Sequence, residues 1–127
     1  FNIHYDHIGQ QAREESSKLV LRQIEKINDE NLPVIWMGDF NVTPDNPAYT
    51  VITSKPQWKD ARLVSAISYG PAGTFTGFVW EKLPDGIIDH IFVSGKIQVI
   101  RHGILTDNYG KKYPSDHFPV LVEVEFY

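Results

Sequence analysis

Residues 33–37 (Pro-Val-Ile-Trp-Met) form a short, unbroken apolar run that ends at Gly38 and Asp39. A run of this length with turn-forming residues beside it is typical of a strand that is buried on both faces. Such a strand needs a sheet with other elements packed on each side. Because Asp39 follows the run directly, polar chemistry is expected where this strand ends.

The segment before the run predicts a helix from about Gln11 to Asn28. Within it, Val20, Ile24 and Ile27 are spaced by four and three residues, which places them on one face of a helix. A helix followed by a buried strand indicates an α/β organisation at the start of the chain.

Later segments predict one short helix and several strands. Pro47 can open a helix that runs to about Ser54, with Asp45 or Asn46 as its cap. Residues 1–4 have the pattern of a strand. Four further segments are rich in β-branched and aromatic residues and are predicted to be strands: Thr74–Trp80, Ile87–Ser94, Ile97–Ile104 and Phe118–Phe126.

The composition restricts the classes of function. With 12 basic and 16 acidic side chains the net charge is -4, which disfavours nucleic-acid binding through a broad basic face, although a metal could still bridge the chain to phosphate. The absence of cysteine excludes disulfides, zinc–thiolate sites and thiol nucleophiles. No apolar run approaches the roughly 20 residues that cross a bilayer, so no membrane span is expected.

Four polar clusters adjoin or interrupt the apolar segments, and they carry the candidate chemistry. Asp39 cannot be buried without a partner charge or a metal, although a turn after the strand also explains it. Asp116 and His117 are adjacent and suit a phosphate site, because they offer a hard oxygen ligand for Mg²⁺ and a nitrogen donor. The clusters are His4-Tyr5-Asp6-His7, Gly38-Asp39-Phe40-Asn41, Ile88-Asp89-His90-Ile91-Phe92 and Ser115-Asp116-His117-Phe118-Pro119-Val120.

Together, in order, type and spacing, these clusters resemble the C-terminal half of the endonuclease/exonuclease/phosphatase family. Residues 73–78 are also similar to the substrate-side loop of that family. The resemblance implies an α/β fold, a DNase I-like β-sandwich flanked by helices in four layers (α/β/β/α). Residues 1–127 would be the C-terminal part of this domain, with one sheet contributed by each half of the chain.

The resemblance also implies catalytic roles. Asp39 would hold or orient the attacking water near a metal, and Asn41 would contact the scissile phosphate. His117 would donate a hydrogen bond to a non-bridging phosphoryl oxygen, while Asp89 would accept from its other ring nitrogen. His4 would act from the other side as a second donor or general acid, and His7 could join it at the rim of the cleft.

The implied cofactor is Mg²⁺ or Mn²⁺, held by Asp39, Asn41 and Asp116. A cysteine-free, Asp-rich set fits this choice, because Mg²⁺ prefers a few carboxylates together with water. Substrate binding is expected at Asn41, Phe75 and Phe78. Aromatic residues at strand spacing are also typical of a core, so the two phenylalanines have two interpretations.

The implied function is a metal-dependent phosphoesterase that hydrolyses phosphodiester or phosphomonoester bonds by in-line attack of water. Its substrate would be a nucleic acid, an inositol phosphate or a phospholipid headgroup. The alternative is a catalytically incomplete fragment that binds a phosphate ligand or a partner, because the Asn and the metal-binding Glu of the family's first half cannot be located here. A half sandwich would expose the apolar face of its sheet, so pairing with the missing N-terminal half or a second copy is expected.

Overall fold

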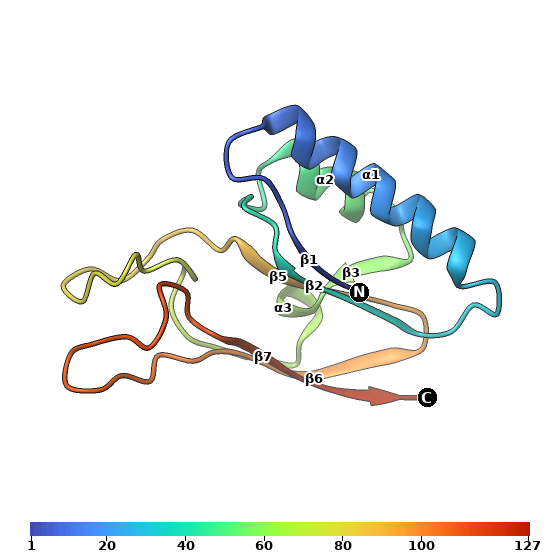
Figure 1. The fold of residues 1–127 in the computed structure, drawn as a ribbon. Coiled ribbons are helices and arrows are strands. Elements are labelled where there is room, and N and C mark those ends of the chain that lie inside the picture. Colours follow the sequence, from blue (N-terminus) through green and yellow to red (C-terminus); the bar gives the residue numbers. More distant parts are fainter.

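The computed structural model describes residues 1–127 and consists of two packed β-sheets, with helices over the outer side of one of them (Figure 1). The larger sheet has the strand order β1-β2-β5-β3, and the smaller sheet has the order β4-β6-β7. None of the helices is long and apolar enough to cross a membrane. The elements are β1 (Asn2–His4), α1 (Gln10–Ile27), β2 (Val34–Asp39), α2 (Pro47–Thr53), β3 (Trp58–Asp60), α3 (Ala61–Val64), β4 (Ile67–Tyr69), β5 (Asp89–Ser94), β6 (Ile97–Ile104) and β7 (Val120–Phe126).

The helices α1 and α2 form one layer against the larger sheet (Figure 1). The buried face of α1 carries Leu21 and Ile24, which lie about one helical turn apart. The helix predicted between Gln11 and Asn28 is therefore confirmed, with each end one residue earlier than expected. The core between this layer and the sheet includes the buried aromatic residues Trp36, Phe40, Tyr49, Trp58 and Phe92.

The short helix α2 is also confirmed, and Asn46 is its cap. The side chain of Asn46 accepts a hydrogen bond from the backbone amide of Ala48 at 2.9 Å. Pro47 follows in the first turn, where the amide hydrogen that proline lacks is not needed by the helix. Asp45, the other candidate cap, instead accepts a hydrogen bond from the hydroxyl of Thr43.

Both sheets are built from this one stretch of chain. Val93 of β5 and Val99 of β6 are buried between the sheets, and Val122 of β7 packs against them. The expectation that each half of the chain contributes one sheet is therefore wrong, because residues of both sheets form a core between them. Met37, at one side of this interface, stays 42% exposed. Pairing with a missing half or a second copy stays a prediction.

Residues 74–80 do not form the predicted strand. Gly77 and Phe78 have positive φ angles of 56° and 63°, which are incompatible with a strand. Within this segment only Phe75 makes a strand-like bridge, to His117. Conversely, the sequence pattern did not predict β3 and β4, which have only three residues each.

The pairing of β1, β2 and β5 sets up the row of residues from which the candidate site is built. The parallel pairing of β1 with β2 places His4 opposite Asp39, and the antiparallel pairing of β2 with β5 places Asp39 opposite Asp89. Residues directly opposite one another on neighbouring strands project from the same face of a sheet. The register therefore brings three polar side chains together at one end of the larger sheet.

Candidate active site

Asp39 lies at the centre of this row and is fixed by the chain around it. Its backbone oxygen accepts a hydrogen bond from the Tyr5 amide at 2.9 Å, and the next amide, that of Phe40, donates to the oxygen of Ile88 at 2.9 Å. Phe40 and Val42 are both buried in the core. The loop after β2 is thus anchored at alternate residues, which holds the intervening polar side chains at the surface.

Asn41 occupies a special backbone position in that loop. Its φ is 51°, in the left-handed region that asparagine tolerates better than most residues. Its backbone amide donates to Oδ1 of Asp39 at 2.8 Å, and its Nδ2 donates to the backbone oxygen of Tyr5 at 2.9 Å. The side-chain oxygen of Asn41 is left without a partner in the chain.

His117 and Asp89 form a close pair, although 28 residues separate them in the sequence. Nδ1 of His117 lies 2.7 Å from Oδ2 of Asp89, and Nε2 lies 3.8 Å from Oδ2 of Asp39. Burial alone would lower the pKa of His117, but the hydrogen bond and charge of Asp89 outweigh it and raise the pKa above its usual range. The charged form of His117, a donor at both ring nitrogens, is therefore favoured.

The carboxyl group of Asp39 lies among charged neighbours. Burial raises its pKa, the hydrogen bond from the Asn41 amide lowers it, and the nearby charge of Asp89 raises it further. His4 approaches from the other side, with Nε2 at 3.3 Å from Oδ2 of Asp39. Two carboxylates and two imidazoles thus converge at one place, where a cation would offset the unfavourable burial of the two carboxylates.

These side chains open into a cavity of about 660 Å³. His7 lies in it together with His4, as the sequence suggested. Phe75 also lines the cavity, half exposed, with its ring centre 5.1 Å from that of His117. Phe78 is 62% exposed and is not among the lining residues, so the structure does not bring it to the site.

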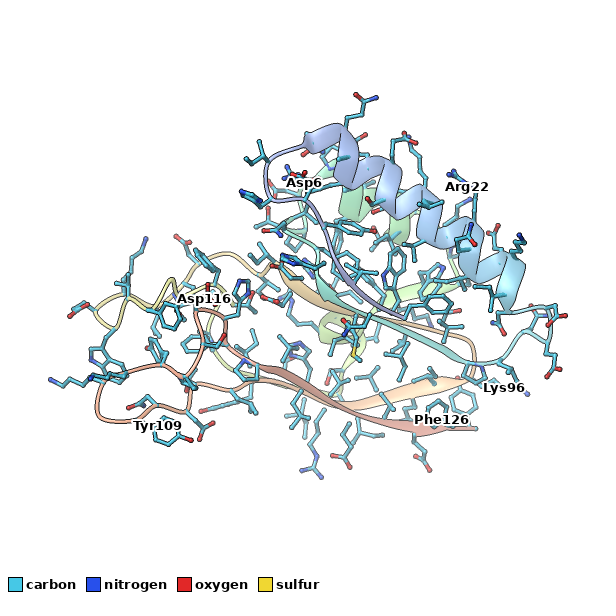
Figure 2. All side chains as sticks on the ribbon, viewed as in Figure 1. Asp6, Arg22, Lys96, Tyr109, Asp116 and Phe126 are labelled. Carbon is cyan, nitrogen blue, oxygen red and sulfur yellow. The ribbon has the colours of Figure 1, made fainter.

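Asp116 reaches the same cavity from the loop that leads into β7 (Figure 2). Its backbone oxygen accepts hydrogen bonds from the amide and the hydroxyl of Thr76, at 2.7 Å and 2.9 Å. Ser115 accepts a hydrogen bond from the amide of His117 at 3.1 Å. The loop that presents Asp116 and His117 is therefore held by short polar contacts.

Ligand atoms of Asp39, Asp89 and His117 all lie within 4.8 Å of one another, and a metal ion there would be held by the two carboxylates, because the charged form of His117 has no free lone pair. The sequence-based set was Asp39, Asn41 and Asp116. Asn41 and Asp116 line the cavity but lie outside this group. Two partly buried carboxylates side by side suit a divalent cation, since its charge would offset their mutual repulsion. The donor set could therefore hold a metal.

Thr74 holds the start of β5 next to the site, a role that the sequence did not indicate. It is fully buried, and its hydroxyl accepts hydrogen bonds from the amides of Ile88 and Asp89 at 3.1 Å and 3.3 Å. It thereby fixes the start of β5. The signal available in the sequence is a threonine beside Gly73 in a segment with β-propensity, and that signal is too common to indicate such a role.

The chain has a DNase I-like α/β fold, which it shares with the catalytic domain of human Nocturnin at 22% identity and a TM-score of 0.71, over 99% of this chain and 45% of that one. Residues 2–117 match the Endonuclease/Exonuclease/phosphatase family, and the chain belongs to that family, a superfamily of phosphoesterases.

Two solved structures of higher identity both come from Bacteroides thetaiotaomicron. One is a mannosyl-6-phosphatase, 41% identical, with a TM-score of 0.95 over 99% of this chain and 50% of that one. The other is an endonuclease/exonuclease/phosphatase family protein, 40% identical, with a TM-score of 0.92 over 99% and 49%. No curated protein matches the sequence. The chain spans about half the length of the solved relatives.

Proposed function

We propose that the chain supplies the catalytic end of a divalent-metal-dependent phosphoesterase that uses water as its nucleophile. The observation that carries the proposal is the convergence of the Asp89–His117 pair and Asp39 on one open cavity. Hydrolysis of a phosphate ester needs an oriented water and compensation of the charge on the equatorial phosphoryl oxygens. Carboxylates and a charged imidazole are suited to both tasks.

The proposed roles follow from the geometry and from the resemblance. Asp39 accepts a hydrogen bond from the attacking water and orients it, and the free side-chain oxygen of Asn41 helps to fix the position of the reacting group. His117 donates from Nε2 to a non-bridging phosphoryl oxygen, while Asp89 holds Nδ1 and so fixes the tautomer and ring orientation. His4 approaches from the opposite side of Asp39 and donates to the phosphate or to the leaving oxygen.

A divalent cation, Mg²⁺ or Mn²⁺, would be held by Asp39 and by carboxylates of the same cavity, with Asp116 as the further candidate. When bound, such an ion polarises the phosphoryl group and lowers the pKa of a coordinated water. The chain's own contribution is to orient the Asp39 carboxylate through the Asn41 amide and to hold the backbone of Asp116 through the hydrogen bonds that Thr76 donates to its oxygen.

A phosphate monoester of a sugar, which was not among the substrates implied by the sequence, has the most specific support. The relative with 41% identity over nearly the whole chain is a mannosyl-6-phosphatase. At this identity the site geometry is expected to be shared, so we propose a sugar phosphate ahead of nucleic acids, inositol phosphates and phospholipid headgroups.

The test is hydrolysis of hexose 6-phosphates and of a generic phosphodiester by the complete protein, with Mg²⁺ or Mn²⁺ and with EDTA. Asp116→Ala should reduce the metal-dependent rate by about 10² or more, because it removes a charge from the metal side of the cavity. Asp107→Ala is the matched control: this exposed carboxylate lies in the same loop between β6 and β7 and does not line the cavity.

Equal rates in these two variants would contradict the role of Asp116, and hydrolysis that survives EDTA would contradict metal dependence. If the protein binds inorganic phosphate in this cavity but hydrolyses none of the esters, the alternative of a phosphate-binding domain replaces the proposed enzyme.

A further inference from the structure

A second cavity, of about 580 Å³, lies next to the candidate active site. It opens between the loop after β2 and the segment that follows β4. Thr43 and Ile87 line this cavity, whereas Asn41 and Ile88 line the active-site cavity. Because consecutive Cα atoms are about 3.8 Å apart, at most about 8 Å of chain separates the two linings. The linings of the two cavities are therefore neighbours along the chain at two places.

Arg62, a residue of the short helix α3, lines this second cavity. Its guanidinium forms no hydrogen bond and no ion pair with another residue of the chain, and its Nε atom is buried without a partner. A guanidinium offers five donors in a fixed plane. The unused N–H groups of Arg62 can therefore donate hydrogen bonds to oxygen atoms of a ligand.

His102 lines the same cavity from β6. It is only 5% exposed, and neither of its ring nitrogens forms a hydrogen bond within the chain. Burial lowers its pKa, so its ring is neutral near neutral pH and offers one donor and one acceptor. Buried polar groups in folded proteins are nearly always satisfied, so an unsatisfied imidazole in a cavity wall suggests a ligand or ordered water.

Two carboxylates at the rim of this cavity favour a neutral ligand over an anion. Asp45 and Asp85 are exposed carboxylates at the rim of the cavity, and the hydroxyl of Thr43 holds the pKa of Asp45 below its usual range. Their charges would repel a phosphate that the single cation of Arg62 attracts. Hydroxyl groups, in contrast, donate to carboxylates and accept from a guanidinium. The exposed ring of Tyr69 also lines the cavity and offers a flat apolar surface.

We propose that this cavity binds the uncharged, hydroxyl-rich part of the substrate, a hexose ring, while the phosphate occupies the neighbouring active site. This inference rests on the proposed phosphoesterase function for its link to catalysis. Arg62 and His102 supply donors to the ring hydroxyls, and Asp45 and Asp85 accept from them. The cavity would thus select for the alcohol part of the ester, independently of the groups that carry out hydrolysis.

The first experiment measures binding of methyl hexosides, which carry no phosphate, by the complete protein. Nuclear magnetic resonance should show shifts at the His102 ring and at the Arg62 side chain on titration with the methyl α-mannoside or methyl α-glucoside. Inorganic phosphate should leave these two signals unchanged and shift those of His117. Binding of phosphate at His102, or no binding of either hexoside there, would overturn the proposal.

The second experiment compares two substrates in the Arg62→Met variant, which keeps most of the aliphatic stem. Its kcat/KM for a hexose 6-phosphate should fall about tenfold or more, whereas its kcat/KM for p-nitrophenyl phosphate should stay unchanged. Arg101→Met is the matched control, because Arg101 is exposed on β6 and pairs with Glu123. His102→Gln, which keeps a donor and an acceptor, should show a smaller loss than Arg62→Met.

The outcomes separate this inference from the function on which it rests. If the wild-type protein hydrolyses p-nitrophenyl phosphate and Arg62→Met has no effect on the hexose phosphate, the sugar site is wrong and the phosphoesterase stands. If hexosides bind at His102 but no ester is hydrolysed, the cavity is a sugar site and the proposed phosphoesterase is wrong.

Discussion

Two Asp–His pairs lie close together in this fold, and they differ in how much of their hydrogen-bonding capacity is used. In the pair at the candidate active site, Asp89 and His117 are 2.7 Å apart with side chains 19% and 25% exposed. In the pair beneath it, Asp60 and His90 are 3.6 Å apart with side chains 2% and 1% exposed. Asp89 and His90 are neighbours in β5, so the alternation of a strand sends one to the cavity and the other to the core.

The buried pair is satisfied on every side. Asp60 accepts from the hydroxyl of Tyr49 and from the amide of Arg62, both at 2.8 Å, and His90 Nε2 lies 2.8 Å from the backbone oxygen of Val42. The pair at the surface leaves Nε2 of His117 directed toward Asp39 at 3.8 Å, without a hydrogen bond. The Asp60–His90 pair therefore stabilises the core, whereas the Asp89–His117 pair can still bind a ligand.

The largest effect on catalysis is expected when the Asp89–His117 pair is broken. His117→Ala should lower kcat about 10²–10⁴-fold, because it removes the proposed donor to the phosphoryl group. The measurement is steady-state hydrolysis of a hexose 6-phosphate, together with a urea unfolding curve to show that the fold persists. A variant that keeps the wild-type kcat would remove His117 from the mechanism.

Breaking the buried pair should instead reduce stability. Asp60→Ala leaves His90 and Tyr49 without their partner and removes the cap of α3, so the free energy of unfolding should fall by about 3–5 kcal/mol. Chemical denaturation measures this change, with Asp89→Ala, from the Asp89–His117 pair, as the control. A loss in Asp89→Ala as large as that in Asp60→Ala would show that the contrast between the pairs is wrong.

A smaller and pH-dependent effect is expected at His102, which faces Asp60 on β3, Arg62 on α3 and His90 on β5. Burial lowers its pKa from the ordinary value of 6.5, so the unfolded chain binds the proton more tightly than the folded one. The stability that the neutral ring contributes is complete above pH 6.5 and is lost as the pH falls through the lower folded pKa. Thermal unfolding of wild type and His102→Gln between pH 5 and 8 measures this loss, and parallel curves for the two proteins would contradict it.

The smallest effect is expected at an ion pair that is neither buried nor catalytic. Arg101 and Glu123 are 3.0 Å apart on the smaller sheet, with side chains 65% and 56% exposed. Glu123→Gln should change the free energy of unfolding by less than about 1 kcal/mol, because exposed pairs are weakened by solvent and by side-chain entropy. The unfolding midpoint in urea measures it, and a change as large as that of Asp60→Ala would show that exposure does not explain the ranking.

The sequence best predicted the elements in which a hydrophobic pattern or a β-rich composition extends over many residues. The stripe that includes Val20 and Ile24 predicted α1 to within one residue at each end, and β6 has the predicted bounds of Ile97–Ile104. The strand predicted at residues 74–80 is wrong, because Gly77 and Phe78 have positive φ angles despite the β-propensity of the segment. Propensity describes a local preference, and here the tertiary contacts of the loop determine its conformation.

From the residues alone, the candidate site could be predicted only as a set of polar clusters, whereas the pairing of Asp89 with His117 was implied by the family resemblance. The sequence placed Asp39, Asp89 and His117 in three separate clusters, whereas the strand register and the Phe75–His117 bridge bring them within 4.8 Å. Register depends on pairing partners far away in the chain, so no local pattern reveals it. The unpartnered Arg62 and His102 belong to no cluster in the sequence, and only the folded chain shows them in one cavity.

The packing of Gly38 determines how this site tolerates mutation. Its φ is 141°, and a Cβ atom added there would lie 1.9 Å from the backbone oxygen of Ile3, on the strand that carries His4. Any of the other nineteen amino acids would therefore push β1 away from β2 and carry His4 away from Asp39. In a saturation library at this codon, only glycine should pass a screen for activity. Position 38 therefore admits only glycine, although glycine has no side chain to contribute to the chemistry of the site.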